Sequence, residues 1–184
     1  DTETMTPSQE RAYRYCPLCG SVLTAKLIKA GEPERLVCGE CEHVVYLDPK
    51  VAVGTIIRME DDRIILVRRA IEPGFGKWVF PGGYVDRGEE MTAAATREAL
   101  EETNLNVRLV GLINIYSYTG RTPVIIVYAA TVVSGVLRHC EESLEIGRFS
   151  RNEIPWHNLA FRSTQEALRD YFDGHLYRHG FDEK

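Results

Sequence analysis

The sequence predicts an α/β protein in which a mixed α/β body follows a small metal-binding segment. Two observations lead to this prediction. β-type runs lie both before and after one central helical segment, and four of the five cysteines fall in two Cys-x2-Cys pairs ahead of that body. We therefore expect residues 1–11 to be a flexible lead or a cloning remnant, 12–48 a zinc ribbon, and 49–184 the main domain.

Composition and charge exclude several classes of protein. The 184 residues are 44% hydrophobic with a formal charge of −5, which is ordinary for a globular chain and unlike a disordered one. The longest largely apolar run, residues 124–133, is about half of a membrane span. No basic-then-apolar leader precedes the first cysteine pair. We expect a cytoplasmic protein that binds neither membranes nor, given its mild acidity, nucleic acid in general.

The two cysteine pairs have the spacing of a structural zinc site. They are separated by 18 residues and consist of Cys16 with Cys19, and Cys38 with Cys41. Two such turns facing each other close a tetrahedron around Zn²⁺, and Gly20 and Gly39 offer the backbone freedom that the turns need. The alternative is four buried or redox cysteines. His43 could replace a thiolate, but with four cysteines available we expect it to be a bystander. A segment this short needs the metal in order to fold.

The remaining elements follow in order along the chain. Two β-rich runs, 51–57 and 63–68, predict a hairpin. A Gly- and Pro-rich stretch, 72–83, leads into a helix over about 89–103. Two further strands are predicted at 107–118 and 122–133, then an acidic loop at 141–145, and a last helix at 165–172, where apolar residues recur at helical spacing.

Three glutamates crowd one face of the central helix. Glu98, Glu101 and Glu102 stand at i, i+3 and i+4, where like charges repel. The last two also meet the negative end of the helix dipole, and Arg97 is the only cation nearby. A solvated acidic face is one interpretation. The other is a divalent cation shared by the carboxylates, and oxygen ligands select Mg²⁺ or Mn²⁺.

The spacing of the residues that precede the three glutamates favours a bound divalent cation over a solvated acidic face. Gly83 is followed after five residues by Glu89, and after seven more by Arg97 and the glutamate cluster. This pattern resembles the box of the Nudix hydrolases. Two positions depart from it: Asn104 replaces the last Gly, and Ala99 is smaller than the usual aliphatic residue. Asn tolerates the left-handed conformation that ends a helix, so the departure is mild.

The resemblance implies a Nudix α/β/α sandwich around a mixed sheet, and hydrolysis of a nucleoside diphosphate linked to another moiety. By position, Glu98 and Glu102 would be the principal Mg²⁺ ligands, with the Gly82 carbonyl completing the shell. Glu101 would assist and Arg97 would orient the carboxylates. Glu89 would support the start of the helix or bind a metal through water.

Two loop glutamates are further candidates. Nudix enzymes commonly take a metal ligand or general base from a loop such as 141–145, which favours Glu142 first and Glu145 second over a merely solvated loop.

A zinc ribbon ahead of the Nudix box narrows the resemblance to those Nudix hydrolases that carry such a ribbon. NADH pyrophosphatases share this order, but their Ser-Gln-Pro-Trp-Pro-Phe-Pro motif is missing from residues 113–123. Residues 15–177 more closely resemble the plant chloroplast-type ADP-ribose/FAD pyrophosphatases and their bacterial relatives, which implies release of AMP and, as in many relatives, a homodimer. Tyr46 and Tyr118 are candidates for stacking on a base, with core packing as the alternative, and Arg121 is a candidate for binding phosphate or ribose.

A rival hypothesis is a non-catalytic zinc-ribbon module that binds nucleic acid or a protein partner. Basic residues of the ribbon are offset by acidic ones, and no basic stripe alternates with aromatic residues.

Overall fold

The computed structural model describes residues 13–178, 180 and 181. The chain divides into two compact units, Asp1–Asp48 and Pro49–Lys184. The predicted flexible lead at 1–11 lies outside the described residues.

The first unit is a small antiparallel sheet built around the cysteine turns. Its strands β1 (Leu23–Lys26), β2 (Arg35–Cys38) and β3 (Val44–Val45) lie in the order β1-β2-β3. Its buried core is formed by Cys16, Leu23, Leu36, Cys38 and Val45.

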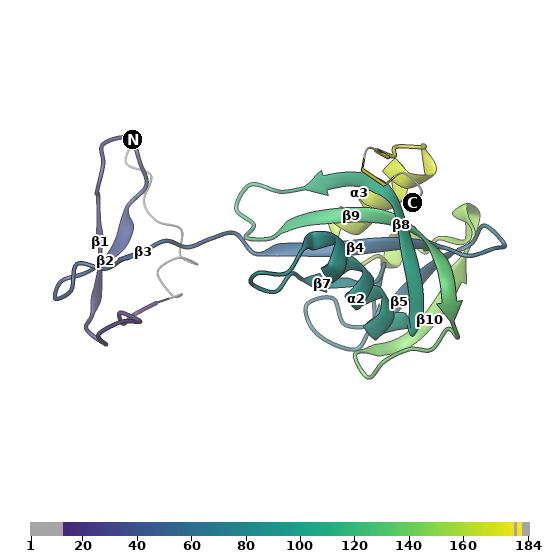
Figure 1. Ribbon diagram of the computed structural model, residues 1–184, viewed down its shortest axis with the longest axis horizontal. Coiled ribbons are helices and arrows are strands. Elements are labelled where there is room, and N and C mark those ends of the chain that lie inside the picture. The colour runs from purple at the N-terminus through teal and green to yellow at the C-terminus, as the bar shows by residue number, and fades with distance from the viewer. Residues whose placement is uncertain (1–12, 179, 182–184) are drawn as a thin grey trace. The chain divides into compact units, whose positions relative to one another are not determined.

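The second unit is a seven-stranded mixed sheet with helices (Figure 1). The path β10-β5-β4-β9-β8 contains one parallel pair, β4 with β9, and short strands β6 and β7 pair with β5 and β4. In chain order the elements are β4 (Val51–Arg58), β5 (Ile64–Arg69), β6 (Trp78–Val79), β7 (Gly82–Tyr84), α2 (Met91–Thr103), β8 (Leu105–Tyr116), β9 (Val124–Gly135), β10 (Ser143–Phe149), the 3-10 turns η1 (Arg151–Glu153) and η2 (Trp156–Asn158), and α3 (Arg162–Phe172).

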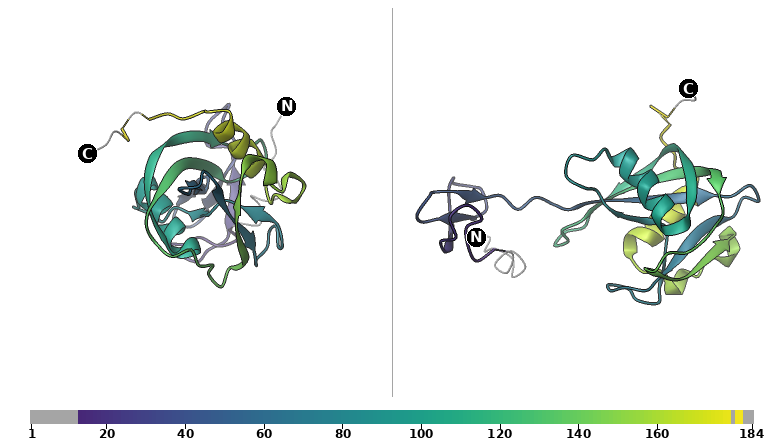
Figure 2. Two further views of the ribbon diagram at one scale, coloured as in Figure 1. Left: turned by 90° about the vertical axis from the view of Figure 1, so that its right-hand side faces the viewer. Right: turned by 60° about the horizontal axis from the view of Figure 1, so that its bottom comes forward.

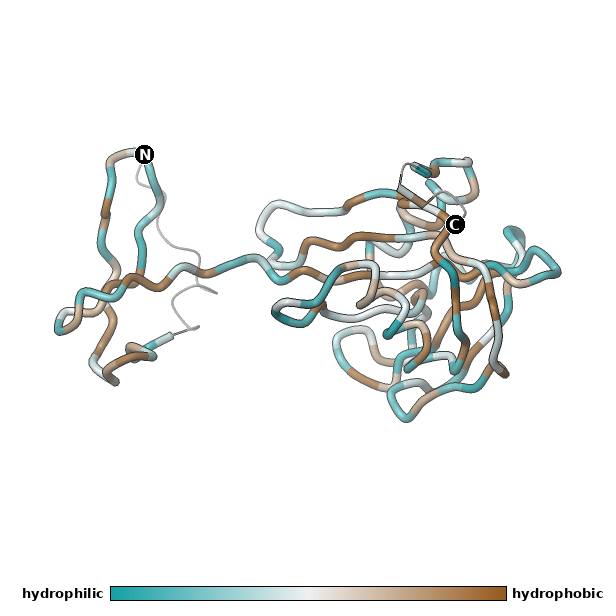
Figure 3. The backbone as a smooth tube through the Cα atoms, viewed as in Figure 1, coloured by the Kyte–Doolittle hydropathy of each residue, from teal (hydrophilic) through white to brown (hydrophobic). Residues whose placement is uncertain are grey.

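Alternation along the central strands sends side chains to two separate cores. On β4, Val53 and Ile57 pack with alanines of α2, whereas Ile56 packs with Ala167 and Leu168 of α3. Because successive strand residues point to opposite faces, α2 and α3 cover opposite faces of the sheet (Figure 2). The hydrophobic stretches of the chain follow these strands (Figure 3). This is the expected α/β/α sandwich. Within the described residues, no helix is long and apolar enough to cross a membrane.

Helix α2 ends as its sequence predicts. Asn104 adopts the left-handed conformation, with φ 58° and ψ 28°, and its N–H donates to the Leu100 carbonyl at 2.8 Å. Its side-chain Nδ2 also donates to the Val136 carbonyl, at 2.9 Å. Asparagine therefore terminates the helix and ties its end to the segment after β9.

Replacing Asn104 by valine is expected to lower the free energy of unfolding by about 1–3 kcal/mol. A β-branched side chain is strained in the left-handed region, and the amide hydrogen bond is lost. Asn104→Gly loses the same bond but relieves the strain, so it should stay within about 1 kcal/mol of the wild type. Urea unfolding of the three proteins checks the difference, and equal losses for both variants would contradict the strain argument.

Some predicted boundaries are wrong. The acidic loop at 141–145 is shorter than expected, because Ser143 begins β10 and lies opposite Arg69 of β5. Helix α3 begins at Arg162 rather than 165. The Gly- and Pro-rich stretch contains β6 and the start of β7, which the periodicity does not reveal because each strand has at most three residues.

Candidate active site

Strand β7 requires glycine at its first two positions. A Cβ on Gly83 would lie 2.5 Å from Glu98 Oε1 and 2.6 Å from Oε2, and a Cβ on Gly82 would collide with the Val53 carbonyl. Glycine here lets strand β7 lie against β4 while the Glu98 carboxylate packs directly on the backbone. The sequence shows Gly83 only as part of a pattern, and the structure supplies the steric reason.

Arg97 gathers the acidic side chains of this loop and helix. Its guanidinium donates to both oxygens of Glu89, at 2.8 and 2.9 Å, and through Nη1 to Glu98 at 2.8 Å and Glu101 at 3.2 Å. Nη2 also donates to the Tyr84 carbonyl at 3.2 Å. The hydrogen bonds from Arg97 lower the pKa of Glu89 to about 2. Glu89 is therefore a permanently charged anchor for Arg97, and it also accepts from the Asp86 N–H at 3.0 Å.

Glu98 and Glu102 are more buried than Glu101, whose side chain is 58% exposed. Burial raises the pKa of Glu102 to about 7, although its Oε2 accepts the Gly82 N–H at 3.1 Å. Burial also raises the pKa of Glu98, and the charges of Glu101 and Glu142 act in the same direction. Two carboxylates held out of water with too little positive charge are suited to a cation.

The charge of Glu142 acts on Glu98 and Glu102, whereas Glu145 forms an ion pair elsewhere. The Glu142 charge raises the pKa of both Glu98 and Glu102, and its carbonyl accepts the Ala70 N–H at 2.8 Å. Glu145 is 55% exposed and pairs instead with Arg68 at 3.5 Å. The structure thus brings the first of the two loop candidates to the cluster and places the second on strand β10.

Sequence reasoning missed Arg69, the cation of this corner. Its charge lowers the pKa of Glu102, its Nε donates to the Pro73 carbonyl at 2.8 Å, and its guanidinium lies 5.2 Å from the centre of the Phe161 ring. Its place at the end of a buried strand, three residues before the Gly- and Pro-rich stretch begins, is the feature that could have marked it.

The carboxylates fit a hard divalent cation by their chemistry. The available donors are oxygens only, from Glu98, Glu102, Glu142 and the Gly82 carbonyl, which suits Mg²⁺ or Mn²⁺ better than zinc. Within residues 13–178, 180 and 181, however, only the cysteines bring three or more ligand atoms within 4.8 Å of one another. The carboxylates are coupled electrostatically but are gathered less tightly than the cysteines.

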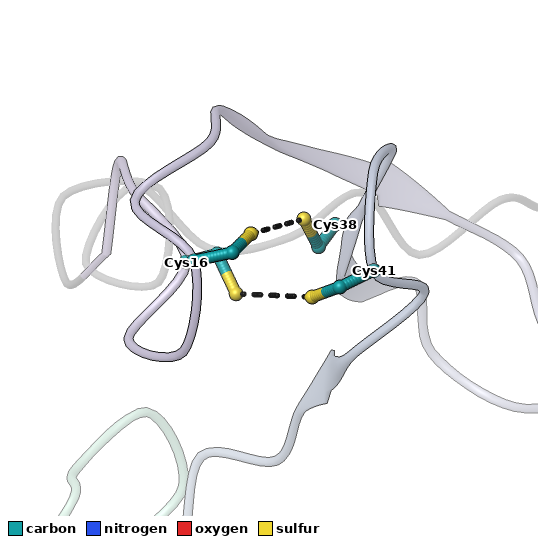
Figure 4. A group of neighbouring side chains, drawn as sticks. Cys16, Cys38 and Cys41 are labelled. Atoms are coloured by element: carbon teal, nitrogen blue, oxygen red, sulfur yellow. Dashed lines mark hydrogen bonds between the residues drawn. The ribbon is translucent and has the colours of Figure 1, made fainter.

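The four paired cysteines form a compact sulfur cluster. Sγ of Cys16 lies 3.6 Å from that of Cys41, and Sγ of Cys19 lies 3.4 Å from that of Cys38. Figure 4 shows the labelled side chains facing one another from the two turns. These separations exceed a disulfide bond and approach the edge of about 3.8 Å of a tetrahedron with Zn–S bonds of about 2.3 Å. The cluster therefore fits Zn²⁺ with no open position.

One detail of the cysteine turns differs from expectation. Gly20 has φ 77°, as the first turn requires, but Gly39 does not adopt a positive φ, and Glu42, with φ 58°, takes that conformation in the second turn. His43 contributes its backbone carbonyl, which accepts the Cys38 N–H at 2.9 Å. Its side chain is not part of the sulfur cluster.

Two of the three predicted substrate-binding residues, Tyr118 and Arg121, lie in one turn, where the Arg121 N–H donates to the Tyr118 carbonyl at 3.0 Å. The Tyr118 hydroxyl donates to Glu166 of α3 at 2.7 Å, and the Arg162 guanidinium lies 4.7 Å from the centre of its ring. Arg121 is exposed in the turn between β8 and β9. Tyr46 belongs to the first unit, is 63% exposed, and has the Arg35 guanidinium over its ring.

Comparison with known proteins finds a matching family model for each of the two units. Residues 48–171 match the NUDIX domain model, and residues 14–47 match the model described as Nudix N-terminal, a zinc ribbon. An ADP-ribose pyrophosphatase of Methanocaldococcus jannaschii is 35% identical, over 84% of this chain and 87% of that protein. A NUDIX hydrolase crystal structure from Nitrosomonas europaea superposes with a TM-score of 0.83 at 32% identity, covering 91% of this chain and 94% of the other.

A more distant relative has a different activity in its name. The NAD-capped RNA hydrolase NudC of Yersinia enterocolitica is 25% identical over 79% of this chain. The chain spans about half of that protein, 54% of its length.

Proposed function

This chain belongs to the Nudix hydrolases, enzymes that use a divalent metal to act on nucleoside diphosphate derivatives, and we propose that its substrate is ADP-ribose or FAD. The products would be AMP with ribose 5-phosphate or with FMN. The observation that carries this proposal is the 35% identity, along nearly the whole of both chains, to an ADP-ribose pyrophosphatase. Membership in an enzyme family argues against the purely non-catalytic zinc-ribbon hypothesis.

We assign the catalytic metal to the coupled glutamates of α2 and of the segment before β10. Glu98, Glu102, Glu142 and the Gly82 carbonyl would hold Mg²⁺, and Glu101 would assist from the exposed side of the helix. The bound metal would neutralise the diphosphate and lower the pKa of an attacking water. Arg97 keeps Glu98 and Glu101 in place and is itself fixed by Glu89. Glu142 is also the candidate general base, since Glu145 is engaged by Arg68.

Fewer observed contacts support the proposed substrate-binding residues than support the proposed metal ligands. Tyr118 remains a candidate for stacking only through the ring face opposite Arg162, because the Arg162 guanidinium covers the other face. Arg121 is the candidate contact for phosphate or terminal ribose, and Tyr46 remains a stacking candidate. A homodimer and a cytoplasmic location are further proposals, and light scattering tests the first.

A second candidate is an NAD(H) pyrophosphatase. The similarity to NudC favours it and extends the possible substrates to NAD-capped RNA, which would correct the expectation that nucleic acid is not a partner. The missing Ser-Gln-Pro-Trp-Pro-Phe-Pro motif argues against it. FAD is proposed in addition to ADP-ribose only from the likeness to the plant chloroplast-type enzymes that the sequence led us to expect.

One assay separates these substrates. The purified protein is incubated with Mg²⁺ and ADP-ribose, FAD, NADH or NAD-capped RNA, and the nucleotide products are resolved by chromatography. AMP with ribose 5-phosphate or FMN is the expected result, and reactions without added Mg²⁺ are the control. Cleavage of NADH or capped RNA alone would favour the second candidate, and no product from any of the four would overturn both.

A further inference from the structure

A segment after α3 crosses the edge of the sheet and joins its two cores. We call residues 176–178, 180 and 181 the strap. Leu176 packs against the core on the α3 face, and Phe181 packs against the core on the α2 face. Between them, Tyr177 pairs with Leu112 of edge strand β8 through two backbone hydrogen bonds of 2.7 and 2.9 Å.

Strand β8 has a glycine where the strap lies against it. A Cβ on Gly111, the residue before Leu112, would lie 2.7 Å from the Leu176 side chain and 2.9 Å from the Tyr177 carbonyl. Only glycine permits this approach of one backbone to another. The path of the strap across strand β8 therefore depends on Gly111, a residue distant from it in sequence.

The side chain of Phe181 packs in the core beneath helix α2, the helix that bears the glutamates. It packs against the cluster of Val53, Ala94, Ala95, Ile126 and Tyr128, with its ring centre 5.9 Å from that of Tyr128. Ala94 and Ala95 lie on α2 itself, and Val53 is the β4 partner of Gly83. The same core thus underlies the helix that bears Glu98 and Glu102 and the strand pair that places Gly82 and Gly83.

We propose that Phe181 is a positioning residue for the metal site, acting through the core beneath α2; this rests on the metal role proposed above for Glu98 and Glu102. Ala94 and Ala95 present only methyl groups to the sheet, so larger neighbours must fill the core and set the position of the helix. Phe181 supplies part of that volume. It lies after residue 171, the last residue matched by the NUDIX model, so the strap is a feature of this chain that the family model does not describe.

The test compares Phe181→Ala with Phe181→Leu and with Ile115→Ala, a control on the same edge strand whose side chain is 53% exposed. Hydrogen exchange is followed by mass spectrometry in peptides covering 91–103 and 162–172, without Mg²⁺. AMP release is then measured against Mg²⁺ concentration. Phe181→Ala should accelerate exchange in α2 but not in α3, and raise the half-saturating Mg²⁺ concentration by roughly 3–10-fold. Leucine should restore most of both properties, and Ile115→Ala should match the wild type.

Gly111→Ala provides a second variant, because it displaces the strap while leaving Phe181 intact. It should accelerate exchange in α2 and raise the Mg²⁺ requirement, and it should also accelerate exchange in α3, because the added methyl group meets Leu176 of the core on that face. For Phe181→Ala, equal acceleration in α2 and α3 would show only a loss of global stability and would overturn the proposal, as would an unchanged Mg²⁺ requirement in either variant. If the wild type cleaves no substrate, the proposed function fails, and the half-saturating concentration is then taken from Mg²⁺-dependent thermal stabilisation together with the exchange pattern.

Discussion

Glu102→Gln is expected to lower the rate of AMP release at saturating Mg²⁺ by at least about 100-fold. Changes in the outer shell of a metal site already cost roughly 10–100-fold, and this change removes a carboxylate that we propose as a ligand of the metal itself. The amide keeps the shape of the side chain and still offers an oxygen to the Gly82 N–H, which Glu102 accepts at 3.1 Å. Glu98→Gln should have a similar effect on the rate.

Folding should survive both substitutions, because each removes a buried carboxylate whose charged form burial disfavours. The matched control is Glu90→Gln, an exposed glutamate directly before the same helix, whose side chain makes no hydrogen bond within the described part of the chain. It should retain wild-type activity. Thermal unfolding with and without Mg²⁺ gives an independent measure: Mg²⁺ should stabilise the wild type and Glu90→Gln but not Glu102→Gln. A fully active Glu102→Gln protein would refute the metal assignment.

Local chemistry explains which features of the fold were predictable. The sulfur cluster follows from cysteine spacing, and the end of α2 follows from the conformational tolerance of Asn104. Both are determined by a few neighbouring residues. The interior of each long strand also follows from its own apolar and β-branched residues, so β4, β5, β8 and β9 lie within two residues of their expected bounds.

Features created by contacts between distant segments were not predictable. Glu141 to Glu145 form a polar run, yet Ser143 begins β10 because the edge of β5 is there to pair with it. Arg69 is an ordinary strand residue until the fold brings its charge near Glu102. The role of Gly111 depends on a strap more than 60 positions away in the sequence. The glutamate spacing predicted an acidic face on α2, but only the structure separates Glu142 from Glu145.

Removal of zinc should unfold the first unit while leaving the second folded. Two of the five buried core residues of the first unit, Cys16 and Cys38, are themselves proposed ligands, so only Leu23, Leu36 and Val45 remain as an apolar core. Structural zinc contributes about 10–16 kcal/mol to the folding of comparable small domains at pH 7. The second unit has its own cores on both faces of its sheet and needs no metal to bury them.

The measurement is zinc content, with hydrogen exchange in residues 13–48 and 49–178 before and after a zinc-selective chelator. We expect one zinc per chain, and complete exchange in the first range only after chelation. The double variant Cys16→Ser and Cys38→Ser should behave like the chelated protein. Cys140→Ser is the matched control, because Cys140 lies outside the sulfur cluster with its Sγ 3.6 Å from Ser143 Oγ. A first unit that stays protected without zinc would mean that hydrogen bonding and three aliphatic side chains suffice to fold it, and the cysteine spacing would then need another explanation.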